Sequence, residues 1–190
     1  MDATSALKAG LPVLLPTDTV YGLASAPDEE AATRLYALKG RGRTQPTAIL
    51  AATVEGLLAA VPELDEPRLR RLLPGPFTLV VPNPAGRFPW LTGGQPGPIG
   101  VRVPTLPVRT SEIVAAVGVV LATSANDPGG PNPTTLDDVP PRIRAGCAAE
   151  LDLGALPGRP STVIDLTHEE PRILREGAVP AAEALRRLRA

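Results

Sequence analysis

Pro16-Thr17-Asp18-Thr19-Val20-Tyr21-Gly22-Leu23 follows directly on a short apolar run, Leu11-Pro12-Val13-Leu14-Leu15. The apolar run predicts a buried strand that ends where the polar residues begin. Ligands of α/β sheets bind beyond the carboxyl ends of strands, and hydroxyl groups gathered there suit a small polar ligand. A simpler interpretation is a turn whose Thr and Asp side chains bond to nearby backbone groups. This stretch alone leaves both interpretations open.

A second informative segment is Lys39-Gly40-Arg41-Gly42-Arg43, at the end of a helix predicted to begin at the Asp28 cap. The chain has 19 Lys and Arg residues in total, and only Lys8 and Lys39 are lysines. The helix dipole favours a lysine at a C-terminus, which would explain Lys39 without any function. Alternatively, Lys39 and Arg41 bracket a polyphosphate or a carboxylate, with glycines that let the backbone approach the ligand. The scarcity of lysine favours the second interpretation.

Further polar motifs follow or begin predicted strands. They are Pro74-Gly75-Pro76-Phe77-Thr78, Val101-Arg102-Val103-Pro104, Ser124-Ala125-Asn126, Ser161-Thr162-Val163-Ile164-Asp165 and Arg175-Glu176-Gly177. Their arginines supply positive charge for phosphates, and their Ser and Asn side chains suit nucleotides, carboxylates or hydroxyls. Each side chain alone has a structural explanation, such as a turn cap or an exposed sheet position. Together they predict one polar site.

Strands and helices interleave along the chain. Predicted strands cover residues 13–15, 48–51, 77–81, 99–103, 119–123, 150–153, 162–166 and 173–174, and predicted helices cover 5–9, 29–38, 53–58, 69–73, 110–117, 142–145 and 181–189. Several neighbouring strands in the C-terminal half lack a helix between them. The expected fold is therefore α+β, a twisted sheet of mixed parallel and antiparallel strands with helices on its faces. No repeat or linker divides the chain, so residues 1–190 are expected to form a single domain.

Composition argues against several classes of function. The net charge of −1 gives no general electrostatic attraction to nucleic acid. Cys147 is the only cysteine and His168 the only histidine, so neither a disulfide, nor a protein-held metal site, nor a histidine-based triad is expected. With no leader and no membrane-length apolar run, we expect a cytoplasmic protein with no membrane partner. A Walker loop and a dinucleotide fingerprint are also missing. The site is therefore expected to act by positioning and electrostatics rather than by covalent catalysis.

Taken in order, these motifs resemble those of the YrdC-like family, the L-threonylcarbamoyladenylate synthases, over about residues 10–177. The resemblance is to short members without an extra C-terminal domain. It implies the mixed sheet that the family shares with one riboflavin-pathway synthase. It also implies adenylyl transfer, in which L-threonine, bicarbonate or CO2, and ATP give L-threonylcarbamoyl-AMP and diphosphate. Mg²⁺ would be held through the ATP phosphates. The product would pass to a tRNA threonylcarbamoyl transferase complex that modifies the adenosine beside the anticodon.

The resemblance also implies roles for individual residues. Lys39 and Arg41 would be catalytic. The residues implied for L-threonine are Thr17, Tyr21, Arg102, Ser124 and Ser161, and those implied for ATP are Lys39, Arg41, Asn126, Thr134 and Arg175. This chain departs from the family at three places: Pro98 stands where a threonine often touches the nucleotide, Gly42 replaces a proline, and Ile49-Leu50-Ala51-Ala52 lacks a histidine. These departures bear on substrate orientation and substrate choice.

Two other functions remain open. An RNA-binding paralogue of different activity would use the basic tail at Arg186, Arg187 and Arg189, although the near-zero net charge predicts only weak direct binding of tRNA. A steep salt dependence of RNA binding would support that alternative. The second alternative is a carbamoyl-adenylate-forming domain, as in hydrogenase-maturation proteins. Those proteins carry zinc-binding domains for which this chain has neither the cysteines nor the length.

Overall fold

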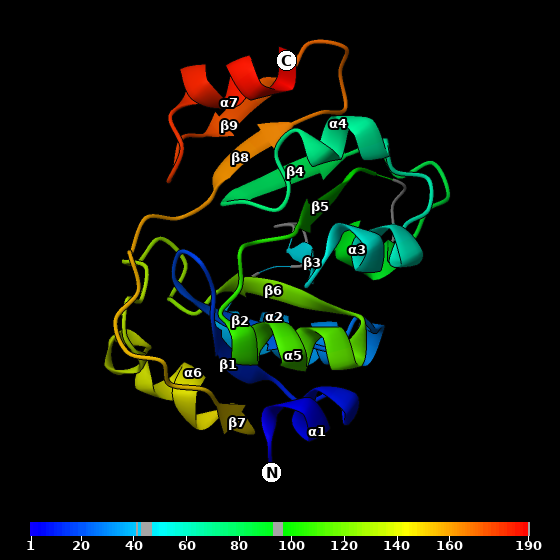
Figure 1. The fold of residues 1–190 in the computed structure, drawn as a ribbon. Helices are drawn as coiled ribbons and strands as arrows, with labels where there is room; N and C mark the ends of the chain where they lie inside the picture. Colours follow the sequence, from blue (N-terminus) through cyan, green and yellow to red (C-terminus); the bar gives the residue numbers. More distant parts are fainter. Residues whose placement is uncertain (41, 43–46, 93–96, 190) are drawn as a thin grey trace.

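One mixed β-sheet organises the fold in the computed structural model, which describes residues 1–40, 42, 47–92 and 97–189 (Figure 1). Its strands are β1 (Val13–Pro16), β2 (Tyr21–Ser25), β3 (Ala48–Ala51), β4 (Phe77–Val81), β5 (Ile99–Arg102), β6 (Val119–Ser124), β7 (Ala149–Glu150), β8 (Thr162–Asp165) and β9 (Arg172–Arg175). Among the described residues these nine strands lie in the order β7-β1-β2-β6-β3-β5-β4-β8-β9. The pairs β1–β7, β3–β5 and β4–β8 are parallel, and the others are antiparallel. The predicted mixed sheet is confirmed.

Helices connect the strands and cover the sheet. The α-helices are α1 (Ala3–Lys8), α2 (Glu29–Lys39), α3 (Val54–Ala60), α4 (Glu66–Arg70), α5 (Val108–Val117), α6 (Pro141–Ala145) and α7 (Ala181–Arg189), with 3-10 turns η1 (Pro89–Thr92) and η2 (Leu136–Asp138). Side-chain caps mark the start of several helices; at α2 the carboxylate of Asp28 accepts a hydrogen bond from the Ala31 N–H at 2.9 Å. Helix α2 ends at Gly40, whose φ of 66° is in the left-handed region that glycine adopts readily. Among the residues that the structure describes, no helix has the length and apolar character needed to cross a bilayer.

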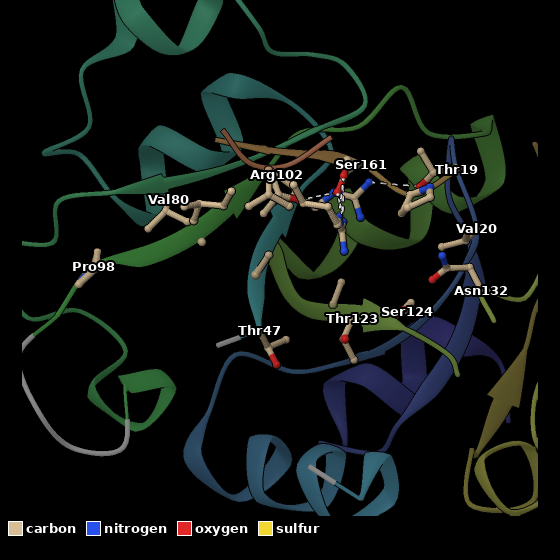
Figure 2. A pocket seen from close by; sticks show the side chains of 18 residues that line it. Thr19, Val20, Thr47, Val80, Pro98, Arg102, Thr123, Ser124, Asn132 and Ser161 are labelled. Carbon is tan, nitrogen blue, oxygen red and sulfur yellow. Dashed lines mark hydrogen bonds between the residues drawn. The ribbon is translucent and has the colours of Figure 1, made fainter. Parts of the chain in front are cut away.

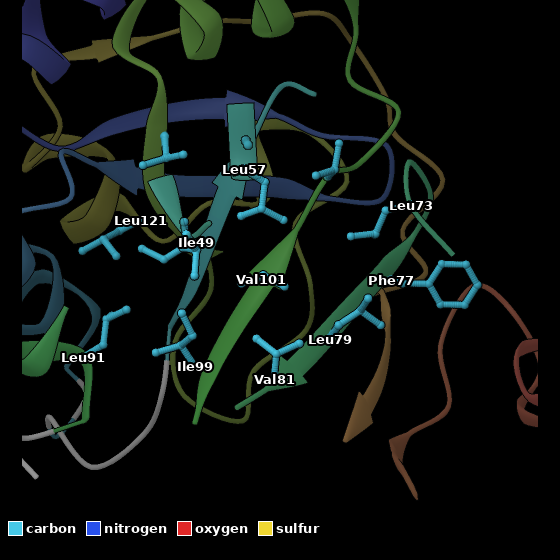
Figure 3. Packing of buried hydrophobic residues seen from close by; sticks show 14 of the residues in the cluster. Ile49, Leu57, Leu73, Phe77, Leu79, Val81, Leu91, Ile99, Val101 and Leu121 are labelled. Carbon is cyan, nitrogen blue, oxygen red and sulfur yellow. The ribbon is translucent and has the colours of Figure 1, made fainter. Parts of the chain in front are cut away.

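The two faces of the central strands carry different side chains, because successive residues of a strand point to opposite faces. One face is apolar and fully packed (Figure 3); its buried residues include Ile49, Leu79, Val81, Ile99, Val101 and Leu121. On the other face Ala48 lies directly across from Ala122 on one neighbouring strand and from Gly100 on the other. This row of small residues leaves space above the sheet.

Helices α1 and α5 close one end of the second face. Leu7 of α1 and Val114 of α5 belong to the same buried cluster as Leu15, Leu50 and Val120 of the sheet. The end nearer β8 and β9 has no such helical cover in this cluster. The open space is therefore confined to one part of the face.

The structure corrects two of the predicted elements and adds one strand. Strand β2 is not predicted, because all five of its residues are buried and no alternation of polar and apolar residues marks it. The helix predicted at 69–73 instead covers Glu66–Arg70, because the Asp65 carboxylate caps it by accepting from the Arg68 N–H at 3.2 Å. Of the strand predicted at 150–153, only Glu150 is confirmed, paired beside β1.

Gly177 allows two segments to approach closely and so places Ser161. A Cβ atom at residue 177 would lie 2.2 Å from the Pro160 carbonyl oxygen and 2.5 Å from the Ser161 carbonyl group. Gly177→Ala is expected to lower the free energy of unfolding by about 1–3 kcal/mol, because the added methyl forces the backbone to shift. Urea denaturation measures this change. Gly56→Ala in α3 is the matched control, since its nearest contact would be an ordinary 3.4 Å; equal stability of the two variants would contradict the prediction.

Candidate functional site

A cavity of about 300 Å³ lies over the small-residue face of the sheet (Figure 2). Ala48, Gly100 and Ala122 form part of its lining, which explains why there is room for a ligand above these strands. Among the described residues, the hydroxyl side chains around it belong to Thr19, Thr47, Thr78, Thr123, Ser124 and Ser161, and the charged side chains to Arg102 and Arg175. A pocket of this size, with cationic and hydroxyl groups converging on it, suits a small anionic ligand.

Arg102 stands at the end of β5 and reaches into the cavity from a largely buried position. Its side chain is 12% exposed, and its terminal nitrogen donates to the Asp18 carboxylate at 3.2 Å and to Thr19 Oγ1 at 3.5 Å. Burial, and the charge of Arg175, lower the pKa of Arg102, while Asp18 acts in the opposite direction. A guanidinium still keeps its charge at neutral pH. The predicted polar motifs at Thr17–Tyr21 and at Arg102 are thus brought together.

Arg175 and Ser161 both line the cavity and contact each other. The Arg175 guanidinium donates to the Ser161 carbonyl oxygen at 2.9 and 3.2 Å and to the Ser161 hydroxyl at 3.2 Å. The Ser161 hydroxyl lies 2.8 Å from Thr78 Oγ1. Two guanidinium groups beside a chain of hydroxyls can bind a carboxylate or a phosphate by charge-assisted hydrogen bonds.

Lys39 is buried and does not line the cavity. Its ammonium donates to the Ser124 carbonyl at 2.5 Å, to Asn126 Oδ1 at 2.6 Å and to the Asn126 carbonyl. Asn126 also accepts from the Ser124 hydroxyl at 2.6 Å and donates to the Gly130 carbonyl at 2.6 Å. Lys39 and Asn126 therefore hold the turn that presents Ser124 to the cavity. Their catalytic and ATP-binding roles stay predictions.

Thr17 and Tyr21 are likewise not among the residues that line this cavity. The Thr17 hydroxyl donates to the Val20 carbonyl at 2.8 Å and so closes the turn between β1 and β2. The Tyr21 hydroxyl lies 2.8 Å from the Gly154 carbonyl and 3.0 Å from the Asp152 carboxylate, and burial raises the pKa of this phenol. Both residues shape the surroundings of the site in this structure. Their contact with L-threonine stays a prediction.

The remaining predicted site residues lie elsewhere. The Thr134 hydroxyl donates to the Asp138 carboxylate at 2.7 Å, and this bond, with those from the N–H groups of Thr134 and Thr135, lowers the pKa of Asp138 to about 2. Thr134 is not among the residues that line the cavity. Arg41 lies outside the described residues.

Several lining residues are missing from the sequence-based set. Thr78 carries a usable signal, because it is a polar residue between the apolar Phe77 and Leu79 of β4. That alternation marks a strand with one face open to a cavity. Thr47 and Asn132 carry no such signal, since each precedes or lies outside a regular element.

Lys39→Met tests the internal role of the ammonium. The change leaves the acceptors of Ser124 and Asn126 unpaired in a buried place, and hydrogen bonds to a charged group contribute about 1.5–3 kcal/mol each. We expect a large fall in melting temperature, measured by calorimetry, together with loss of ligand binding. Lys8→Met is the matched control, because Lys8 is the other lysine and is exposed on α1. A Lys39→Met protein as stable as the control would mean that the ammonium does not hold this turn.

Comparison with known proteins places this fold and cavity in a family. The Sua5/YciO/YrdC family model, described as "Telomere recombination", matches residues 5–177. A threonylcarbamoyl-AMP synthase of Chromohalobacter salexigens is 37% identical over 175 residues, which are 89% of this chain and 93% of that protein. The crystal structure of Pyrococcus abyssi Sua5 complexed with L-threonine matches with a TM-score of 0.85 and 33% identity, over 97% of this chain and 56% of that one.

A further solved structure supports the fold alone. Escherichia coli YciO matches with a TM-score of 0.82 at 23% identity, over 96% of this chain and 90% of the YciO chain. The family model, the Chromohalobacter salexigens relative and the Pyrococcus abyssi structure agree on one family, and they confirm the resemblance carried by the motifs. The chain belongs to the Sua5/YciO/YrdC family.

Proposed function

We propose that this protein is a threonylcarbamoyl-AMP synthase, which makes L-threonylcarbamoyl-AMP and diphosphate from L-threonine, ATP, and bicarbonate or CO2. The observation that carries the proposal is the cavity end where Arg102 and Arg175 face a set of hydroxyl groups. It occurs on the fold of a Pyrococcus abyssi protein crystallised with L-threonine. Such an end can hold an amino-acid carboxylate beside a phosphate.

The reaction forms two bonds, and in the second a carbamate anion must approach the negatively charged triphosphate of ATP. The threonine amine attacks the one-carbon unit to give a carbamate and loses a proton; with CO2 the proton passes to solvent, and with bicarbonate it leaves with the displaced hydroxide as water. A carbamate oxygen then attacks the α-phosphorus of ATP, and the bond to the leaving diphosphate breaks. Preorganised cations offset the charge that gathers at the α-phosphorus, and they cost no reorganisation during the step. In this proposal Arg102 holds the threonine carboxylate, and Arg175 faces the nucleotide.

Ser124 and Ser161 would orient the threonine between these cations. Each hydroxyl is held by a neighbour, Ser124 by Asn126 at 2.6 Å and Ser161 by Thr78 at 2.8 Å. Side chains already fixed in the free protein lose little entropy when the ligand binds. They can therefore align the reacting groups, which contributes a large part of the rate in a reaction between separate substrates.

Mg²⁺ would enter with ATP in this proposal. The polar groups that line the cavity are hydroxyl, amide and guanidinium groups, and no three carboxylate, imidazole or thiol groups gather in the described part of the chain. That donor set fits the anionic oxygens of a nucleotide. Magnesium usually binds through phosphates and waters, with few protein carboxylates, and would neutralise phosphate charge. The product would then pass, in the cytoplasm, to a transferase complex acting on tRNA.

The proposed function is tested by incubating the protein with ATP, L-threonine, bicarbonate and Mg²⁺. We expect release of diphosphate that depends on L-threonine, together with a threonylcarbamoyl-AMP product detected by mass spectrometry. Mixtures without threonine or without bicarbonate are the controls. Diphosphate release no faster than in the threonine-free mixture would reject the proposal.

Arg175→Met tests the nucleotide side of the site. Losing one charge-assisted contact to a phosphate is expected to raise the KM for ATP about 10- to 100-fold, with a smaller effect on the KM for threonine. Arg172→Met is the matched control, because Arg172 lies on the same strand and does not line the cavity. Equal KM values for ATP in the two variants would remove Arg175 from the nucleotide site.

A further inference from the structure

We propose that Asp18 is a positioning residue for this site: its carboxylate stands behind the Arg102 guanidinium and holds it toward the cavity. Arg102 lines the cavity and Asp18 does not, so Asp18 acts through Arg102 rather than on the ligand. The identity of the ligand rests on the proposed function. The contact itself rests on the geometry alone.

The contact joins the turn between β1 and β2 to the end of β5. Arg102 is 3.2 Å from Asp18 Oδ1, and the two side chains are 12% and 10% exposed. Thr17 shapes the turn that carries Asp18, because its N–H and its hydroxyl both bond to the Val20 carbonyl, at 3.2 and 2.8 Å. The hydroxyl-rich motif thus builds a turn whose aspartate is aimed at an arginine 84 residues further along the chain.

The negative charge of Asp18 offsets the repulsion between Arg102 and Arg175. Burial, and to a smaller extent Arg175, lower the pKa of Arg102, and Asp18 is the group that acts against them among the described residues. Two guanidiniums near one cavity end repel each other when no ligand is bound. Without the Asp18 charge, Arg102 is expected to turn away from Arg175 and lose its orientation.

The ion pair adds little to the stability of the fold. Burial raises the pKa of Asp18 even though Arg102 and the Thr105 N–H act to lower it. Asp18 Oδ2 and Arg102 Nε are buried without a hydrogen-bond partner. Buried charges with unsatisfied atoms often cost more free energy than their attraction returns. The Asp18–Arg102 pair lies beside the cavity and contributes little to the stability of the fold, as expected for a pair that serves ligand binding.

Asp18→Asn tests the inference, because it keeps the shape of the side chain and removes its charge. We expect the KM for L-threonine to rise about 10- to 100-fold, with kcat and the KM for ATP changed much less. The Arg102 Nε–H signal in NMR, identified by its loss in Arg102→Lys, should exchange faster with water. Asp18→Glu, which keeps the charge, should recover part of the threonine affinity. Glu63→Gln is the matched control, since it breaks the Glu63–Arg87 ion pair away from the cavity and should change none of these values.

A pH profile separates this role from general destabilisation. The Asp18 carboxyl must be ionised to hold Arg102, so the wild-type KM for threonine should rise as the pH falls through the raised pKa of this carboxyl. Arg102 is the charged group that acts on Asp18, and Arg175 acts on Arg102; both stay protonated across this range. The Asp18→Asn variant should therefore lack this acid limb.

The outcomes distinguish this inference from the proposed function. A wild-type protein that releases no diphosphate rejects the proposed function, and the NMR comparison then decides whether Asp18 orders Arg102. If Asp18→Asn does not fold, the same signal and the threonine KM are read in Asp18→Glu, where displacing the carboxylate by one methylene should still alter both. Wild-type values of both in every folded Asp18 variant would overturn the inference.

Discussion

The alternation of side chains along the central strands is the constraint on which the rest of this structure depends. Ile49 and Val101 point to one face and fill the core, while Ala48 and Gly100, one residue before each, point to the other. A sheet cannot shift its register by one residue without exchanging these faces. The same pairing that builds the core therefore also sets where the cavity lies and which side chains surround it.

Much of the fold follows from local sequence. Apolar runs bounded by Pro or Gly predict most of the strands, and Asp28 and Thr53 mark helix starts by the caps that they form. Strand β2 is different, because it is buried on both faces and contains Gly22, so neither alternation nor β-propensity identifies it. Strand order is also beyond local reasoning: β6 lies between β2 and β3 only because of pairings over a long sequence separation.

The candidate site is predicted less evenly than the fold. Motif residues at the ends of strands, such as Arg102 and Ser124, do line the cavity, although β5 and β6 run in opposite directions and the cavity extends across the face between their ends. Lys39 illustrates what a motif cannot tell: its charge at a helix end suits a phosphate, yet in this structure the ammonium faces inward and bonds to Asn126. Whether a polar side chain serves the ligand or the scaffold depends on three-dimensional neighbours. Asp18 is a different case: it is a motif residue, but it acts on the ligand only through Arg102.

The small residues under the cavity allow the depth of the cavity to change while the packing of the core stays the same. Because Ala48, Gly100 and Ala122 point away from the main core, exchanging a hydrogen for a methyl there alters the depth available to a ligand while Ile49 and Val101 keep their packing. Substitutions between small residues at these positions can therefore change the length of the substrate side chain that the cavity accepts. Arg102 and Arg175 would still bind the negatively charged group that these ligands share.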